Sequence, residues 1–153
     1  MSTSYPAGGP PSGAPGGKTS LGLDSNLGAM LCYIVNIVNI LCGIGIILSV
    51  ILSIVFLITE KENRFVKFHA LQALFLDAAF VGLVIILVII LEVPRAILGG
   101  VLSGLIGLGL AFMPLLMLLI FIALSILAGI KAYGGQWYKL PGIGGIAFKM
   151  VNK

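Results

Sequence analysis

The sequence contains few charged residues. Its 9 basic and 5 acidic side chains make up 9% of the 153 residues, whereas 59% of the residues are hydrophobic. A soluble domain usually carries about 25% charged residues, so this chain has too little polar surface to cover a water-soluble core. The composition excludes an ordinary soluble protein and predicts that lipid surrounds much of the chain.

Side chains for metal binding and acid–base chemistry are also scarce. Cys32 and Cys42 would lie about 15 Å apart on one continuous helix, which is too far for a disulfide, so we interpret them as packing residues. His69 is the only histidine, and no zinc-site spacing, P-loop, GxSxG or HExxH motif occurs. We expect neither an enzyme nor a protein that holds a cofactor or a metal.

The first 26 residues form a segment rich in Gly, Pro and Ser. Such a segment has little to bury, which predicts a disordered tail. It lacks the basic region of a signal peptide and the arginines of a transit peptide, so we expect the apolar segment that follows to be retained as a membrane anchor. We divide the chain into this tail over 1–26, a helical membrane domain over 27–149 and a C-terminal end over 150–153.

The apolar runs predict an all-α membrane protein, a compact bundle of about four transmembrane helices of which the first two are short. As one helix, the run 27–58 would be about 48 Å long, which exceeds the hydrocarbon thickness of about 30 Å. Gly43 and Gly45 offer a break in this run. We therefore expect two short helices, over 27–42 and 44–59, that form a hairpin or a sharply kinked pair.

Two longer apolar runs follow. The third helix is expected over 65–91, because Pro94 cannot continue a helix and disfavours the helical conformation of the residue before it. The fourth span is expected over 110–133, with a kink at Pro114. The stretch 96–109 is a re-entrant segment, an interfacial segment or an extension of the last helix.

The basic residues predict orientation in the membrane. The net charge of +4 does not indicate nucleic acid, because basic side chains lie beside apolar runs in the 59–67 loop and from Lys131 onward. Such loops usually face the cytoplasm, and Trp137 and Tyr138 suit the headgroup layer as interface anchors. We expect a multi-pass protein of the cytoplasmic membrane whose C-terminus is cytoplasmic. With the four expected spans the N-terminal tail is cytoplasmic as well, whereas three spans would place it outside.

Asp77 is the most informative polar residue. It lies about 12–14 Å along the third helix from Phe68, near the middle of the bilayer. An ionised aspartate there costs about 2.5–3.5 kcal/mol on insertion scales. Two interpretations stay open. Asp77 is either a proton or ion site, or a neutral acid that hydrogen-bonds to Asn36, Asn39 or a serine of a neighbouring helix.

Other polar side chains also suggest contacts between helices. Asn36 and Asn39 share one helical face, which indicates either helix–helix packing or the lining of a polar path. His69 and Gln72 lie one turn apart near the cytoplasmic end of the third helix, where a histidine serves as an interface anchor or as a hydrogen-bond donor.

Small residues recur every four positions in the stretch after Pro94. Gly99, Ser103 and Gly107 form one such series, and Gly100 with Gly104 forms a second. Small faces of this kind allow close helix approach. They predict either packing within the molecule or the contact surface of a homo-oligomer.

Two stretches resemble the motifs of a family of small prokaryotic membrane proteins of unknown function. RFVKFHALQA at 64–73 resembles its RFVRFHA-Q signature, and KAYGGQWYKLPGI at 131–143 resembles its closing KAY-G…KLP-IG motif. LCY at 31–33 is similar to its opening LCYL. The matching motif residues are Arg64, Phe65, Val66, Phe68, His69, Ala70, Gln72, Lys131, Tyr133, Lys139 and Pro141.

That family is grouped with the twenty-kilodalton subunit of the chloroplast inner-envelope Tic import complex, a four-helix protein proposed to form part of a preprotein channel. The resemblance implies a similar helical architecture. It favours a non-enzymatic accessory or structural subunit of a membrane assembly, with the lipid bilayer and either copies of itself or other membrane proteins as partners. The alternative is a small transporter or oligomeric channel that uses Asp77 with Asn36 and Asn39.

Overall fold

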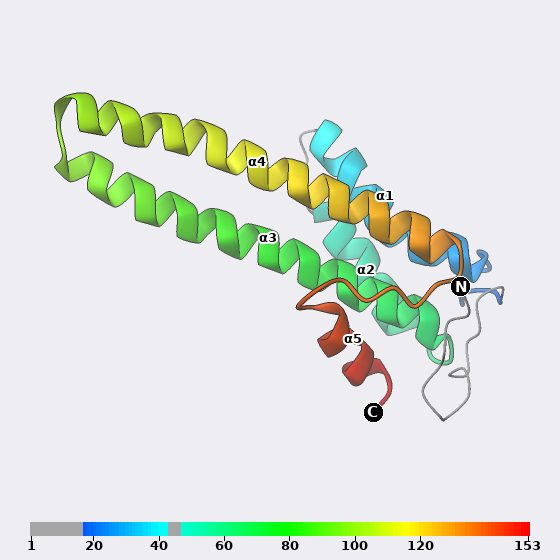
Figure 1. Ribbon diagram of the computed structural model, residues 1–153. Helices are drawn as coiled ribbons and strands as arrows, with labels where there is room; N and C mark the ends of the chain where they lie inside the picture. Colours follow the sequence, from blue (N-terminus) through cyan, green and yellow to red (C-terminus); the bar gives the residue numbers. More distant parts are fainter. Residues whose placement is uncertain (1–16, 43–46) are drawn as a thin grey trace.

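The computed structural model describes residues 17–42 and 47–153 and is built from helices (Figure 1). The helices are α1 (Ser25–Leu41), α2 (Ile47–Thr59), α3 (Arg64–Ile97), α4 (Gly100–Tyr133) and α5 (Gly144–Val151). Within these ranges the only β pairing is an isolated bridge between Lys18 and Asp24. The predicted all-α fold class is confirmed.

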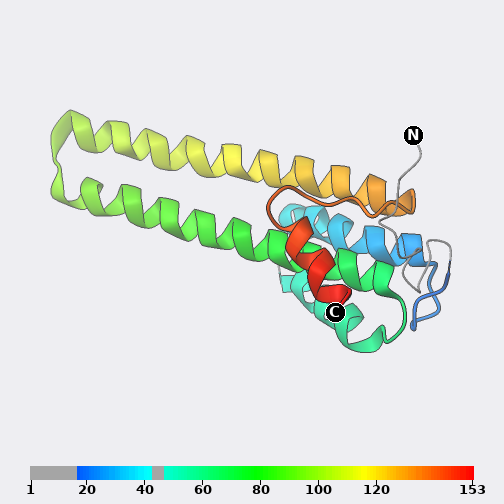
Figure 2. The ribbon, with the colours of Figure 1, turned by 60° about the horizontal axis from the view of Figure 1, so that its bottom comes forward.

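A long antiparallel hairpin of α3 and α4 dominates the shape (Figures 1 and 2). Each of these helices has 34 residues, a length of about 51 Å. The other helices gather around one end of the hairpin, which we call the base, and the opposite end at Leu98–Gly100 is the tip. The molecule is therefore elongated, and a compact helical bundle occupies only its base.

The α1–α2 pair reaches only part of the way along the hairpin. With 17 and 13 residues, these helices are about 26 and 20 Å long. The first turn of α2 contacts α3 through Ser49 and Asp77, and Asp77 lies less than halfway along α3. Only α3 and α4 have the length and hydropathy of full membrane spans among the described helices, so the number of crossings stays a prediction.

The third helix is longer than the sequence predicted. It continues through Pro94 to Ile97, so the predicted end before Pro94 is wrong. Pro94 stands in the last helical turn, where its missing N–H removes a single backbone hydrogen bond. The Leu98 N–H donates to the Pro94 carbonyl at 2.8 Å, and Arg95 pairs with Glu92 at 3.1 Å. These local contacts accompany the continuation of the helix for one turn beyond the proline.

Most of the stretch 96–109 extends the last helix, which was one of the three alternatives stated, while residues 96 and 97 end α3. From Gly100 onward it is continuous with the predicted 110–133 span, and Pro114 lies inside α4. Near the tip, Gly107 and Gly109 allow the Arg95 and Leu91 side chains to lie against α4. Close packing between the two long helices therefore continues almost to the tip.

The N-terminal boundary also differs from the expectation. Residues 17–26, which were expected to belong to a disordered tail, have definite contacts. The Ser20 N–H donates to Glu60 at 2.7 Å, Asn63 donates to Ser25 at 2.5 Å, and Asp24 caps α1. The rest of the expected tail and the expected break around Gly43 and Gly45 lie outside the described residues.

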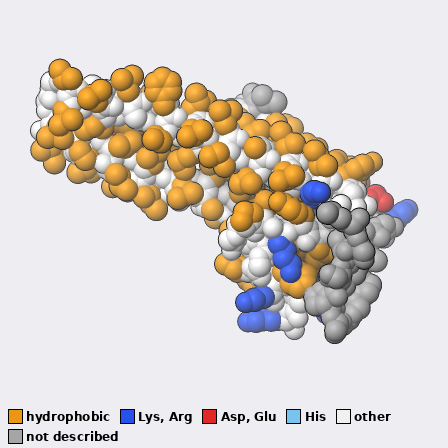
Figure 3. Space-filling model, in the orientation of Figure 1, with side chains coloured by type: hydrophobic (Ala, Val, Ile, Leu, Met, Phe, Trp, Pro, Cys, Tyr) orange, Lys and Arg blue, Asp and Glu red, His pale blue; other side chains and the backbone are white. Residues whose placement is uncertain are grey.

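Hydrophobic side chains cover the hairpin, whereas lysine and arginine side chains lie on the base (Figure 3). All basic residues except Arg95 belong to segments at the base. The buried core also lies at the base, where Tyr33, Phe56 and Phe65 are fully buried. The fold therefore separates a well-packed base that carries basic residues on its surface from an apolar hairpin that extends away from it.

Candidate functional site

Asp77 of α3 lies at the centre of a group of buried polar side chains. Its Oδ2 atom accepts a hydrogen bond of 2.8 Å from the Ser49 hydroxyl of α2. The Asn36 amide of α1 lies near the same carboxyl, although outside normal hydrogen-bond geometry. A serine on a neighbouring helix was one of the partners expected for Asp77.

The packing of α4 against α3 places Ser125 at the same height along the hairpin as Asp77. The Phe80 and Phe121 rings of α3 and α4 stack with centroids 4.5 Å apart. One turn closer to the base on each antiparallel helix, the same faces carry Asp77 and Ser125. Gly129 of α4 likewise packs against Tyr33 of α1.

The contact between Gly129 and Tyr33 determines how α1 is positioned lengthwise against α4. One turn closer to the tip on each helix, these faces carry Ser125 and Asn36. Each of the four helices α1–α4 thus contributes one side chain to a single layer. We call this the polar layer, and its members are Asn36, Ser49, Asp77 and Ser125.

The polar layer is fully enclosed, and much of its hydrogen-bonding capacity is unused. All four members have zero exposure, as have Asn39 and Ser53, one turn from Asn36 and Ser49 on the same faces. The buried polar atoms of these six residues without a hydrogen-bond partner among the described residues are Asn36 Oδ1 and Nδ2, Asn39 Oδ1 and Nδ2, Ser53 Oγ, Asp77 Oδ1 and Ser125 Oγ. Buried polar atoms in proteins are normally paired, so this concentration of unpaired atoms makes the polar layer the candidate functional site.

A second polar group joins α1, α3 and the C-terminal segment. The Gln72 side chain donates to the Tyr33 hydroxyl at 2.8 Å and to the Tyr138 carbonyl at 3.1 Å. Its Oε1 atom accepts from the Leu140 N–H at 3.1 Å. Gln72 thereby uses both ends of its amide to hold the 136–140 segment against the base.

His69 completes this group. Its Nε2 atom lies 3.1 Å from the Gln136 carbonyl, which can only accept, so Nε2 carries the proton. Its Nδ1 atom then accepts from the Tyr33 hydroxyl at 3.1 Å. The side chain is fully buried, so of the two expected roles His69 has that of a hydrogen-bond donor inside the base.

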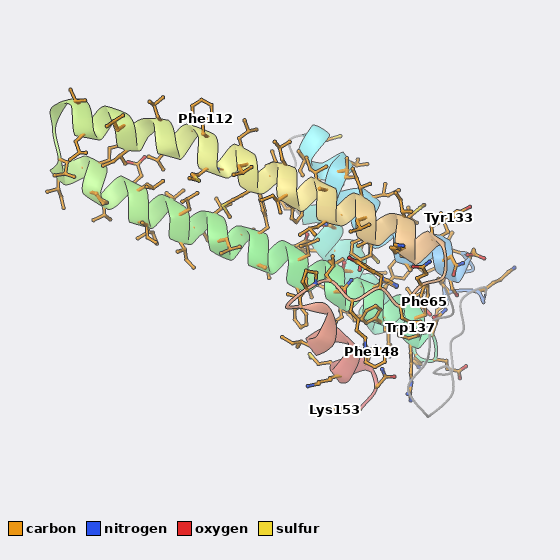
Figure 4. The ribbon with its side chains drawn as sticks, in the orientation of Figure 1. Phe65, Phe112, Tyr133, Trp137, Phe148 and Lys153 are labelled. Atoms are coloured by element: carbon orange, nitrogen blue, oxygen red, sulfur yellow. The ribbon has the colours of Figure 1, made fainter. Side chains whose placement is uncertain are left out.

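The expected interface anchors pack partly inside the base (Figure 4). Trp137 lies with its ring centroid 5.4 Å from that of Phe65 and 5.8 Å from that of Phe148, and both Trp137 and Tyr138 are half-buried. The Lys139 ammonium lies 3.6 Å from the centroid of the Phe148 ring. The aromatic residues therefore attach the C-terminal segment and α5 to α3.

The remaining motif residues divide between the core and the surface. Phe65, Val66, Phe68 and Ala70 are fully buried, whereas Arg64, Tyr133 and Pro141 are exposed and Lys131 is half-buried. The two sequence motifs thus lie against each other in the structure, because buried side chains of 64–73 hydrogen-bond to the backbone at 136–140.

Ser49 and Ser125 of the polar layer were not identified from the sequence. A serine in an apolar helix commonly bonds to its own backbone, so its identity alone carries little signal. Both serines also lie far from Asp77 in the sequence, on other helices, so no helical periodicity links them to it. Only helix packing brings them to the same level.

Two long, exposed apolar helices, a buried polar layer and a basic base are typical of an integral membrane protein. The chain belongs to the magnetosome magnetite crystal formation protein family, whose model matches residues 24–149. Residues of this range form α1 to α4 and most of α5. No solved structure matches the chain.

Curated relatives carry the description of membrane protein. A UPF0132 membrane protein of Methanocaldococcus jannaschii is 41% identical over 86% of this chain and 92% of its own length. A second from the same organism is 34% identical over 84% of this chain and 71% of its own length. A UPF0132 membrane protein of Archaeoglobus fulgidus is 34% identical over 74% of this chain and 95% of its own length. The resemblance to a family of small prokaryotic membrane proteins is confirmed, whereas these matches lend no support to the Tic resemblance.

Proposed function

We propose that this protein is a non-enzymatic structural or accessory subunit of a membrane assembly and that its α3–α4 hairpin is the assembly surface. The observation that carries the proposal is the exposure of the hairpin beyond Asp77, where large apolar side chains such as Ile89, Leu105 and Phe112 are each more than half exposed. Lipid accommodates such a surface, and so does a neighbouring membrane helix.

The glycines near the tip support contact with another helix. No atom of the described residues lies within 4 Å of the position that a Cβ would occupy on Gly99, Gly100 or Gly104. A glycine that is not covered within its own molecule leaves the backbone accessible to a partner helix. Gly107, in contrast, lies beside Arg95 of the same hairpin. Thus the Gly100/Gly104 face is free for an intermolecular contact.

The charge distribution supports a cytoplasmic base. Cationic segments flanking membrane helices are retained in the cytoplasm, and Lys61, Arg64 and Lys67 lie at the same end as Lys139 and α5. In this arrangement α3 and α4 cross the cytoplasmic membrane, and the shorter α1–α2 pair enters and leaves from the cytoplasmic side. Both ends of the described chain are then cytoplasmic.

The assembly surface is tested with a glycine substitution and a matched control. Gly104→Leu should disrupt self-association or co-purification with membrane partners, because the larger side chain prevents close helix approach. Gly145→Leu adds the same side chain to an equally open glycine of α5 and should have no effect. Both variants are compared by size analysis in mild detergent and in nanodiscs, and by quantitative mass spectrometry of gently solubilised membranes. An unchanged assembly with Gly104→Leu contradicts the proposal.

A small transporter or channel is the second candidate, and the polar layer favours it. Intramembrane acids often lie on ion or proton pathways, and Asp77 is accompanied by polar side chains from three other helices. A translocon-like form of the subunit role rests on the sequence motifs at 64–73 and 131–143 alone. The description of the matched family concerns magnetite crystal formation, and our proposal rests instead on the surface of this chain.

A further inference from the structure

The polar layer contains buried oxygen atoms from several helices at one level of the fold. Asp77 Oδ1, Asn36 Oδ1 and Ser125 Oγ come from three helices, are buried and have no hydrogen-bond partner in the described part of the chain. The packing contacts of Phe80 with Phe121 and of Tyr33 with Gly129 place these side chains at one level. Buried oxygens without partners are costly, so an electropositive ligand that contacts their lone pairs would stabilise this layer.

We propose that the polar layer binds one monovalent alkali cation. Carboxylate, amide and hydroxyl oxygens are the ligands that hard cations prefer. The layer contains a single carboxylate, so one positive charge makes the site neutral, whereas a divalent ion would leave a net charge enclosed by apolar helices. The Ser49 hydroxyl orients the carboxyl by donating to Oδ2, which leaves Oδ1 for the cation.

A cation explains more of the layer than a proton does. Protonation of Asp77 would neutralise the carboxyl and supply one O–H donor, which can serve only one of the Asn36 and Ser125 oxygens. A cation contacts all three oxygens, and the ionised carboxylate then offers the nearby Asn36 amide group an acceptor. This inference needs only the polar layer, so it is independent of the assembly role proposed for the hairpin.

The test is thermal unfolding of the full chain in lipid nanodiscs, followed through the fluorescence of Trp137, the chain's single tryptophan. Sodium, potassium and choline chlorides are compared at constant ionic strength. A ligand that binds only the folded state raises the unfolding temperature with concentration, so sodium or potassium should do so and choline should not. Radioactive ²²Na⁺ binding to the same nanodiscs provides a direct measure, with one ion per chain expected, displaced by potassium if that ion binds more tightly.

Three variants identify the site. Asp77→Asn should abolish the cation-dependent shift, and Ser125→Ala should raise the half-saturating concentration by about tenfold through loss of one ligand. Glu92→Gln removes an exposed acid near the tip and should leave the response unchanged. If Asp77→Asn does not fold, Ser125→Ala and direct ion binding to the unmodified chain still decide the matter. Equal stability in sodium, potassium and choline, or an unaltered response in Ser125→Ala and Asp77→Asn, overturns the proposal.

Discussion

At the scale of single residues, two glycines fix the path from the 136–140 segment into α5. Gly142 has a φ of +82°, a left-handed conformation that side chains with a Cβ disfavour. Gly144 lies directly against the backbone, since a Cβ there would be 2.6 Å from Lys139 Cα and 2.5 Å from Gln72 Oε1. The glycines in the closing motif thus serve close packing as well as turning.

Substitution of Gly144 should be far more harmful than substitution of its neighbour. Gly144→Ala forces the backbone of Lys139 and the Gln72 side chain to move, and overpacking of this kind costs about 1–3 kcal/mol. Gly145→Ala is the control, because no described atom lies within 4 Å of its Cβ position, and alanine favours a helix by about 1 kcal/mol. Thermal unfolding in nanodiscs should show opposite signs for the two variants. Equal effects would contradict the close approach at Gly144.

At the scale of elements, hydrogen bonds rather than a continuous helix hold the C-terminal segment. The 136–140 segment is not helical, so its backbone groups need partners from elsewhere. Gln72 supplies an acceptor for the Leu140 N–H and a donor for the Tyr138 carbonyl, while His69 donates to the Gln136 carbonyl. The first turns of α3 therefore bind the 136–140 segment through the His69 and Gln72 side chains.

Loss of the Gln72 amide should release this segment. Gln72→Met keeps much of the side-chain volume but leaves buried backbone groups unpaired, at a cost of about 1–3 kcal/mol for each group. We expect faster hydrogen exchange at Leu140 and a lower unfolding temperature. Gln136→Met is the matched control, since the Gln136 side chain is exposed and its carbonyl is retained. Mass spectrometry of the peptides covering 136–144 measures the exchange, and unchanged protection in Gln72→Met would show that the segment is held by other contacts.

At the scale of the whole molecule, charge and apolar surface are segregated along the hairpin. The tip carries the Glu92–Arg95 pair, whereas all other basic residues belong to the base. The length of α3 and α4 exceeds the hydrocarbon thickness of about 30 Å, so the base and the tip can reach opposite faces of the bilayer. In the proposed topology the short α1–α2 pair ends inside the membrane, near the level of Asp77.

Thiol labelling of intact cells should reveal this arrangement. On a background without Cys32 and Cys42, single cysteines replace Lys18, Ile97 or Lys153. An impermeant reagent should label only Ile97→Cys, because the proposed topology places Lys18 and Lys153 at a cytoplasmic base. Permeabilised cells provide the control by exposing all three positions. Labelling of Lys18→Cys in intact cells, with Lys153→Cys protected, would instead indicate three crossings.

Hydrophobic runs and turn residues predicted helices at the positions of α1 to α4, because in lipid each apolar segment must satisfy its own backbone hydrogen bonds. They did not predict α5 or the full lengths of α3 and α4. The error at Pro94 arose because a proline costs one backbone hydrogen bond and a local clash without forbidding the helix to continue, and α3 continues to Ile97. The structured residues 17–26 were missed for a related reason. Their order comes from contacts such as Ser20 with Glu60, which a Gly- and Ser-rich composition does not reveal.

The sequence by itself determined that this is an all-helical membrane protein, because composition and run length decide which solvent surrounds each segment. It also identified Asp77, Asn36, His69 and Gln72 as residues that require partners, since polar groups are costly in an apolar environment. Only the tertiary structure decided which partners they have. Antiparallel packing of four helices brings Ser49 and Ser125 to the level of Asp77, and that alignment depends on side-chain packing between segments far apart in the chain.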